Sequence, residues 1–301
     1  MIDDFTPAVH CGASDSIERR RFPTVAAGKV GRLFGYVLAL CALPCLALAE
    51  NIQWEQLADG VAVSVWNPGE PCPAVPSLLA IEIDPDRARF VIHHYAHEKH
   101  AHPPTIEEWQ KRTGHDVIFN AGLFRENFAY LGLLYKDGRS LGSRRHTTWQ
   151  GLFVAEPLAP GLKKARVLDL AVEAFDEQHP PYQEAAQALM LLDRNKTIRV
   201  RETGKRAYQT IIAETDQGRI LIFKSRDVTS LYDIGRCLRD TLPVVRRAMA
   251  MDGGSSSDLL VSESLWQSNL QNEHRIFWKA LFGGSTSAHI PLPTVIGVSR
   301  R

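Results

Sequence analysis

The chain has 301 residues, of which 45% are hydrophobic and 23% are charged. This composition is typical of a globular protein and excludes disorder, collagen-like repeats and a protein with many membrane spans. An N-terminal leader holds five of the 35 Lys and Arg residues and four of the 34 Asp and Glu residues, so the remaining chain has 30 of each and no net charge. A neutral chain of this kind argues against nucleic acid as a partner.

Residues 1–49 have the pattern of a signal peptide. Basic residues between Arg19 and Arg32 precede the apolar run Leu33–Ala49, which ends in the small-x-small sequence Ala47-Leu48-Ala49. This pattern predicts cleavage before Glu50 and export to the periplasm or the medium. The alternative is a retained anchor, because the run approaches the length that spans a bilayer. Pro44 and the polar chain that follows favour cleavage, which would leave no stable membrane span.

Residues 50–301 are predicted to form a single domain, because they contain no internal repeat and no linker-like segment. After the leader, Cys72 and Cys237 are the two remaining cysteines. In an exported chain they could form a disulfide or remain buried free thiols, and their spacing leaves both alternatives open.

The first part of this domain predicts strands. Val61–Trp66 has alternating valines, which is typical of a strand with one buried face. Leu79–Ile83 and Arg87–His93 flank the turn-forming sequence Asp84-Pro85-Asp86, so these two segments are predicted to form a hairpin.

A helix follows, and then two short strands. Thr105-Ile-Glu-Glu108 has the pattern of a capping box, so a helix is predicted to begin there and to end at Gly114. Val117–Asn120 and Leu131–Tyr135 are predicted strands, the second of which is followed by the turn dipeptide Asp137-Gly138.

The central part predicts a second helix and a second hairpin. Pro181 suits the first turn of a helix, and apolar side chains at helical spacing extend the prediction to Leu192. Gln209–Ala213 and Arg219–Phe223 are predicted to pair as a hairpin around a glycine-containing turn.

The last part combines a helix with two strands. Ser230-Leu-Tyr-Asp233 predicts a capped helix with an apolar face, and Ala248–Met251 and Thr294–Val298 are predicted strands. Because helical and extended segments are interleaved and the hairpins imply antiparallel pairing, the predicted class is α+β, with a mixed, largely antiparallel sheet and packed helices.

The strongest candidate site is the turn Asp252-Gly253-Gly254-Ser255-Ser256, which directly follows a short apolar strand. The two glycines allow positive φ angles and a close approach of a ligand to the backbone. The serine hydroxyls and the backbone N–H groups could form an anion nest for a phosphate or a sugar oxygen. The alternative is a tight glycine-rich turn in which the aspartate caps its own backbone.

Two further segments are candidates for the same site. Asn120-Ala121-Gly122-Leu123-Phe124 also follows a strand, and its asparagine offers a donor and an acceptor to a ligand. Arg206 precedes the strand Gln209–Ala213, and a guanidinium can bind a phosphate in a bidentate manner. The alternatives are a turn that uses Asn120 and Gly122 only structurally, and a solvated surface charge beside Lys205.

Taken in order, these segments resemble the phosphodiester glycosidase family. The likeness spans about residues 80–298. Its parts are Asn120-Ala-Gly-Leu-Phe124, Gly132-Leu-Leu-Tyr-Lys-Asp137-Gly138, Arg206 before a hairpin, and a capped helix that leads to Met251-Asp-Gly-Gly-Ser-Ser-Ser257. The Asp-Gly-Gly-Ser turn is the most specific part and Arg206 the least specific. The sequence departs from the pattern at Ser255, where many members have glycine, and at Arg125-Glu126-Asn127.

The resemblance implies an exported hydrolase that cleaves a sugar-1-phosphodiester, either a small molecule or a glycan, at the glycosidic bond. It assigns Asp252 to the catalytic pocket, with Asn120, Gly122 and Arg206 around the sugar and the phosphate. Because glycoside cleavage commonly uses two carboxylates, Glu126 is the candidate partner of Asp252. Arg206 and the backbone of Gly253–Ser256 would stabilise the charge of the phosphate.

Two other functions are open from the sequence. A non-enzymatic envelope protein could bind a sugar phosphate or a cell-wall glycan in the same pocket. A metal hydrolase could use the His93–His102 stretch, in which His93 and His97 have the i,i+4 spacing of two helical ligands, although residues 94–104 are predicted to form a loop. No cofactor is predicted, but carboxylates and asparagine could hold calcium or magnesium without a recognisable motif.

Overall fold

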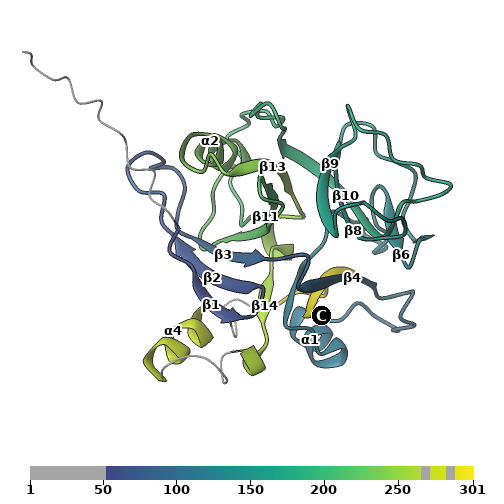
Figure 1. Ribbon diagram of the computed structural model, residues 1–301, viewed down its shortest axis with the longest axis horizontal. Coiled ribbons are helices and arrows are strands. Elements are labelled where there is room, and N and C mark those ends of the chain that lie inside the picture. The colour runs from purple at the N-terminus through teal and green to yellow at the C-terminus, as the bar shows by residue number, and fades with distance from the viewer. Residues whose placement is uncertain (1–51, 266–271, 283–288) are drawn as a thin grey trace, which may run out of the picture. The chain divides into compact units, whose positions relative to one another are not determined.

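Two antiparallel β-sheets dominate the computed structural model, which describes residues 52–265, 272–282 and 289–301 (Figure 1). All of these residues belong to one unit, Ala47–Arg301. The predicted signal peptide lies outside the described residues. None of the helices in the described ranges is long and apolar enough to cross a membrane.

The larger sheet has eleven strands in the order β1-β2-β3-β12-β11-β13-β10-β6-β7, with β8 pairing with β10 and with β9. These strands are β1 (Glu55–Ala58), β2 (Val61–Trp66), β3 (Leu78–Ile83), β6 (Leu134–Lys136), β7 (Arg139–Ser140), β8 (Gly151–Pro157), β9 (Ala165–Asp169), β10 (Tyr182–Leu192), β11 (Thr210–Thr215), β12 (Ile220–Ser225) and β13 (Val245–Ala250).

The smaller sheet has four strands in the order β14-β5-β15-β4, which are β4 (Ala88–His94), β5 (Val117–Asn120), β14 (Leu259–Val261) and β15 (Thr294–Arg300). The described helices are α1 (Ile106–Thr113), α2 (Leu231–Thr241), α4 (Asn272–Phe282) and the short 3-10 turn η1 (Gly254–Ser256).

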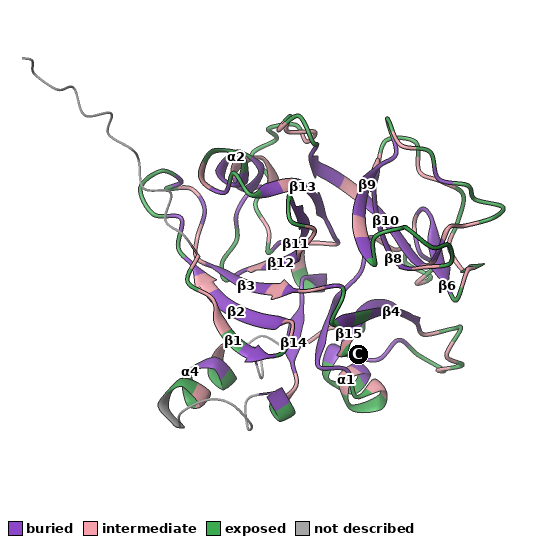
Figure 2. Cartoon of the chain, viewed as in Figure 1, coloured by how far each residue is buried: buried purple, intermediate pink, exposed green. Residues whose placement is uncertain are grey.

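The main hydrophobic core lies between the two sheets. It joins Ile222 of β12 and Met249 of β13 to Phe90 of β4, Phe119 of β5 and Ile296 of β15. Side chains alternate between the two faces of a strand, so these residues cover the inner faces of both sheets. Figure 2 shows most of the strands as buried and the connecting loops as more exposed. Burial of this apolar area is the main force that holds the sheets together.

The helices α1 and α2 cover the outer faces of the sheets, whereas Trp278 and Phe282 of α4 join the main core. Ile234 and Leu238 of α2 pack in a second apolar cluster with Phe223 of β12, on the opposite face of the larger sheet. Ile106 and Trp109 of α1 pack in another cluster with the smaller sheet. The helices α1 and α2 therefore each bury one apolar stripe against a sheet, as expected for an amphipathic surface helix.

The prediction of a largely antiparallel sheet is confirmed, but helices contribute less than the predicted α+β class requires. The segment Pro181–Leu192 was predicted as a helix, and this prediction is wrong: Tyr182–Leu192 is the strand β10. Nine of its eleven residues are buried, because β10 lies centrally and pairs with β13, β8 and β6. A strand buried on both faces has apolar residues at nearly every position, so some of them necessarily fall at helical spacing.

The predicted hairpin at Asp84-Pro85-Asp86 is also wrong. Both strands exist, but β3 pairs with β2 and β12 in the larger sheet, whereas β4 pairs with β15 in the smaller sheet. The turn therefore carries the chain from one sheet to the other. Turn composition identifies a change of direction but does not specify which strand becomes the neighbour.

The predictions of helix ends and of the second hairpin, which rest on residues a few positions apart, are confirmed. Thr105 and Glu108 form the predicted capping box, and Gly114 ends α1 in the left-handed conformation with φ 69°. Ser230 caps α2 by accepting a hydrogen bond from the backbone of Asp233. The predicted hairpin of β11 and β12 is confirmed by five consecutive residue pairs.

A disulfide joins Cys72 to Cys237, whose Cα atoms lie 5.6 Å apart. It ties the segment between β2 and β3 to α2 across a sequence separation of 165 residues. From the sequence, a disulfide and two buried free thiols were both possible. The structure shows the disulfide, and both cysteines lie in the apolar cluster beneath α2.

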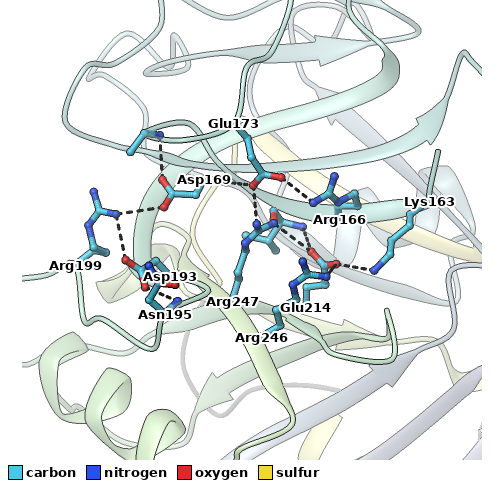
Figure 3. Close-up of polar contacts among 12 residues, drawn as sticks. Lys163, Arg166, Asp169, Glu173, Asp193, Asn195, Arg199, Glu214, Arg246 and Arg247 are labelled. Atoms are coloured by element: carbon cyan, nitrogen blue, oxygen red, sulfur yellow. Dashed lines mark hydrogen bonds and ion pairs between the residues drawn. The ribbon is translucent and has the colours of Figure 1, made fainter.

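A network of charged side chains fixes β9 against β11 and β13 (Figure 3). Glu214 of β11 is fully buried; it accepts hydrogen bonds from the backbone N–H of Val167 at 3.1 Å and from Lys163 Nζ at 3.1 Å. Arg247 of β13, which is 1% exposed, donates to the Val167 carbonyl at 2.9 Å and pairs with Glu173 at 2.8 Å. Buried charges are tolerated here because they are paired and hydrogen-bonded.

Candidate active site

The candidate site forms where the ends of strands from both sheets meet. β5 of the smaller sheet ends at Asn120, and β13 of the larger sheet leads into Asp252. A backbone hydrogen bond joins these ends, because Asp252 N–H donates to the Ala121 carbonyl at 3.1 Å. Asn120 N–H donates to the Asp258 carbonyl at 3.2 Å, next to the pairing of β5 with β14. The structure therefore brings together two of the segments that the sequence singled out, although 132 residues separate Asn120 from Asp252.

Asn120 is the centre of this arrangement and is 1% exposed. Its Nδ2 donates to the carbonyls of Ala121 at 3.1 Å and Asp252 at 2.8 Å. Its Oδ1 accepts from the Thr210 hydroxyl at 2.8 Å and from the Asp258 N–H at 3.0 Å. The amide thus uses all of its hydrogen-bonding capacity within the protein. Asn120 holds the Asp252 turn in position, and no polar atom of its side chain is left free for a ligand.

Two hydroxyl residues extend this arrangement. The Thr210 hydroxyl has a single proton, which it gives to Asn120, so the Ser257 hydroxyl at 2.8 Å is the donor in the bond between the two. Both residues are buried. The sequence analysis did not assign Thr210, because it lies inside a predicted strand where threonine is a common residue.

The Asp252 carboxylate is the titratable group of the turn and is half-buried. Burial raises the pKa of Asp252 above its ordinary value. Hydrogen bonds from the Ser256 hydroxyl and from the Gly253 N–H lower it again in part, because they stabilise the charged form. A carboxyl group with a raised pKa can take up and release a proton closer to neutral pH, which suits general acid or base chemistry.

The backbone of the turn depends on its two glycines. Gly254 has φ 68°, a conformation that other residues rarely adopt. A Cβ atom on Gly253 would lie 2.9 Å from the Tyr208 carbonyl, so this position has no room for a side chain. Ser256 is buried and faces Asp252, whereas Ser255 is exposed and leaves its hydroxyl on the surface of the turn.

Gly122 is buried beneath the site. Its N–H donates to the Tyr130 hydroxyl at 3.2 Å, and this hydroxyl donates to the Gln187 carbonyl at 2.7 Å. A Cβ on Gly122 would lie 2.8 Å from the same carbonyl. Burial raises the pKa of the Tyr130 phenol, and the negative charge of Asp252 raises it further, so Tyr130 keeps its proton. Gly122 and Tyr130 thus form part of the buried scaffold on which the site is built.

Arg206 and Glu126 lie at the surface. The Arg206 guanidinium is exposed and donates to the Val228 carbonyl at 2.9 Å. Glu126 is exposed in the tight turn between Arg125 and Ala129, whose backbone is closed by a 2.9 Å hydrogen bond. In the described part of the chain, neither side chain contacts Asp252.

A second buried acidic residue, Asp258, contacts Asn120 through its backbone N–H, and the sequence analysis missed it. Asp258 is 5% exposed and directly precedes β14. One of its carboxylate oxygens accepts the Leu259 N–H at 2.9 Å, and the other accepts a hydrogen bond from His289. The available signal was its position six residues after Asp252, at the end of the serine run.

The histidine-rich stretch has a different geometry from two helical metal ligands. His93 lies in the strand β4, and its ring contacts Glu98 at 2.8 Å and His115 at 2.7 Å. Space for the His115 ring exists because residue 297 in β15 is glycine. Among the described residues, no group of three or more His, Cys, Asp or Glu side chains is arranged to hold a metal.

The fold and the site define a mostly antiparallel β-protein with a carboxylate on a glycine-serine turn at the junction of two sheets. The sequence profile of the phosphodiester glycosidase family matches residues 113–299. The chain therefore belongs to the phosphodiester glycosidase family, as its resemblance to that family had implied. No curated protein matches the sequence.

Several solved structures share the fold, and two of them follow. The catalytic domain of zebrafish N-acetylglucosamine-1-phosphodiester alpha-N-acetylglucosaminidase, auto-inhibited by its pro-peptide, matches with a TM-score of 0.52 and 15% identity, over 80% of this chain and 89% of that chain. A hypothetical protein from Synechocystis matches with a TM-score of 0.55 and 12% identity, over 83% of this chain and 64% of that chain. At these identities the likeness shows the fold alone.

Proposed function

We propose that this protein is an exported hydrolase that cleaves a sugar-1-phosphodiester at the glycosidic bond. The observation that carries the proposal is the half-buried Asp252 carboxylate, whose pKa is raised, at the start of a glycine-serine turn. Membership of a family of glycosidase-type hydrolases supplies the reaction class. The zebrafish relative is named for action on an N-acetylglucosamine-1-phosphodiester, so this sugar is the first candidate.

The reaction breaks the bond between the anomeric carbon and a phosphate oxygen. Water supplies the new oxygen on the anomeric carbon, and the phosphate leaves as a monoester. Asp252 would act as the acid, base or nucleophile. The Ser255 hydroxyl and the backbone N–H groups of Ser255 and Ser256 would bind substrate oxygens beside the bond that breaks. The N–H groups of Gly253 and Gly254 are already bonded to the Asp252 carboxylate and to the Tyr208 carbonyl. Because a phosphate leaves readily, the step does not require a second carboxylate as acid.

The candidate roles of Arg206 and Glu126 place different demands on the structure. The Arg206 guanidinium has five N–H donors and gives one hydrogen bond to the Val228 carbonyl, so it could bind a phosphate with its other donors. Glu126 would have to move with its exposed turn to act as the carboxylate partner of Asp252.

Export is supported by two features. The leader has a basic segment, an apolar run and a small-x-small end. The Cys72–Cys237 disulfide is typical of proteins that reside in an oxidising compartment such as the periplasm or the medium. We therefore propose a periplasmic or secreted location after cleavage before Glu50.

A non-enzymatic protein that binds a sugar phosphate or a cell-wall glycan is the second candidate. The observation that favours it is the exposed position of Glu126, which leaves Asp252 without its expected carboxylate partner. Such a protein would be stabilised against heat by N-acetylglucosamine 1-phosphate but would release no product from any phosphodiester.

The test is release of free sugar from the methyl phosphodiester of N-acetylglucosamine 1-phosphate and from a small panel of related sugars. Asp252→Asn keeps the size of the side chain but removes its charge, and Asp216→Asn in the exposed β11–β12 turn is the matched control. We expect turnover by the wild type and by the control, and a loss of at least about a hundredfold in Asp252→Asn. Full activity in Asp252→Asn would refute the assignment of the site.

A further inference from the structure

A cavity of about 240 Å³ lies among β3, β12, β14, α4 and His289. Its polar lining consists of Lys224, Arg226, Asp258 and His289, and its remaining lining is largely aliphatic. The two basic side chains outnumber the single carboxylate. The cavity therefore combines positive charge with an apolar wall, which is a common composition for a site that binds an anionic organic group.

The cavity adjoins the Asp252 turn. Lys224 of β12 is directly opposite Thr210 of β11 in the antiparallel ladder, and opposite residues project to the same face of a sheet. Thr210 uses that face to contact Asn120 and Ser257. The Lys224 side chain therefore lies on the same face, and at the same end of the strands, as the site.

Tyr208 connects the two regions a second time. Lys224 Nζ lies 5.7 Å from the centre of the Tyr208 ring. The carbonyl of Tyr208 accepts the N–H of Gly254 at 2.8 Å. Tyr208 thus contacts both the turn and Lys224, which lines the cavity. Asp258 provides a further connection, because it lines the cavity and its N–H donates to Asn120, which holds the Asp252 turn in position.

The Lys224 ammonium lacks a close counter-charge. Within the described residues it makes no ion pair, and the charge of Asp258 acts on it only at longer range. Both oxygens of Asp258 are engaged, by the Leu259 N–H and by His289. Burial lowers the pKa of Lys224, because it disfavours the charged form. An oxyanion beside Nζ would offset the free-energy cost of burying the charged ammonium group.

We propose that this cavity is the subsite for the phosphate of the substrate, with Lys224 Nζ as its main donor and Arg226 as a second cation at the rim. The proposal rests on the proposed function. It assigns the phosphate to Lys224 rather than to the Asp252 turn or to Arg206, neither of which lines the cavity. Carbon atoms next to the phosphate would contact the apolar wall, and the sugar would face the Asp252 turn.

Binding of inorganic phosphate tests the subsite without any turnover. Calorimetric titration of the purified protein is compared with Lys224→Met, which keeps the length of the side chain, and with Lys224→Arg, which keeps its charge. Lys164→Met, at an exposed lysine between β8 and β9, is the matched control. We expect Lys224→Met to weaken phosphate binding by about tenfold or more, the effect of a lost charge-assisted hydrogen bond. Lys224→Arg and Lys164→Met should retain binding.

Two results would overturn the proposal: no binding by the wild type at about 10 mM phosphate, or equal binding by the wild type and Lys224→Met. If Lys224→Met does not fold, Arg226→Met provides the second variant, because Arg226 is exposed and its loss should leave the fold intact while weakening phosphate binding. Unchanged binding in Arg226→Met would then count against the subsite.

The outcome is separable from that of the proposed reaction. Phosphate binding that depends on Lys224, in a protein that cleaves no phosphodiester, would support the subsite and contradict the hydrolase. Cleavage with the same KM in the wild type and Lys224→Met would support the hydrolase and contradict the subsite.

Discussion

Replacement of Asn120 by alanine should destabilise the protein and disorder the Asp252 turn. The amide makes four hydrogen bonds, which connect β5 to the Asp252 carbonyl, to Thr210 and to the Asp258 N–H. Alanine would leave the Asp252 carbonyl and the Asp258 N–H without these partners. Each unsatisfied buried group costs about 1–3 kcal/mol, so we expect a loss of about 3–4 kcal/mol in the free energy of unfolding.

Urea denaturation followed by tryptophan fluorescence measures this loss. Asn67→Ala is the matched control, because Asn67 is exposed; this substitution should change the free energy of unfolding by less than about 0.5 kcal/mol. In a protein with substrate turnover, Asn120→Ala should also lower kcat, since the Asp252 carboxylate would lose its fixed position. If Asn120→Ala is as stable as Asn67→Ala, the buried amide does not organise the site and our reasoning is refuted.

Two further predictions concern the scaffold. Reduction of the Cys72–Cys237 disulfide should lower the free energy of unfolding by up to about 5 kcal/mol, because the bond closes a long loop across 165 residues; thermal melts with and without reductant measure this, and the double alanine variant should not respond to reductant. Burial of Glu184 raises its pKa to about 7, so the folded protein retains this proton at pH values where the unfolded chain, with a pKa near 4.5, has released it. The free energy of unfolding should therefore fall as the pH rises from about 4.5 to about 7, and Glu184→Gln should remove up to about 3 kcal/mol of this dependence; parallel pH profiles for the wild type and Glu184→Gln would contradict the assignment.

Predictions from the sequence were correct where they depended on residues close together in the chain. The Thr105 capping box, the Gly114 helix end and the β11–β12 hairpin depend on residues a few positions apart, so their chemistry can be read directly from the chain. The Asp252 turn was found for the same reason, because two glycines and three serines after a buried strand form a contiguous pattern.

The wrong predictions concern segments whose structure depends on contacts with residues distant in the sequence. Tyr182–Leu192 contains alanines, leucines and a methionine that suit a helix, but its central place in the sheet makes it a strand. Leu78–Ile83 and Ala88–His94 adjoin one turn yet belong to different sheets. Burial against partners distant in sequence outweighs local preference in both cases, because more free energy comes from packing than from propensity.

The sequence alone determined the family resemblance, the largely antiparallel pairing of the strands and the turn at Asp252, because each of these depends on residues that are close together in the chain. Only the tertiary structure decided that Asn120 is fully used inside the protein and that Asp258 lies beside it. It also decided that Cys72 meets Cys237 and that Lys224 shares a face with Thr210. Hydrogen bonds, disulfides and charge contacts require atoms within a few ångströms, and in this chain the folding of two sheets against each other creates that proximity.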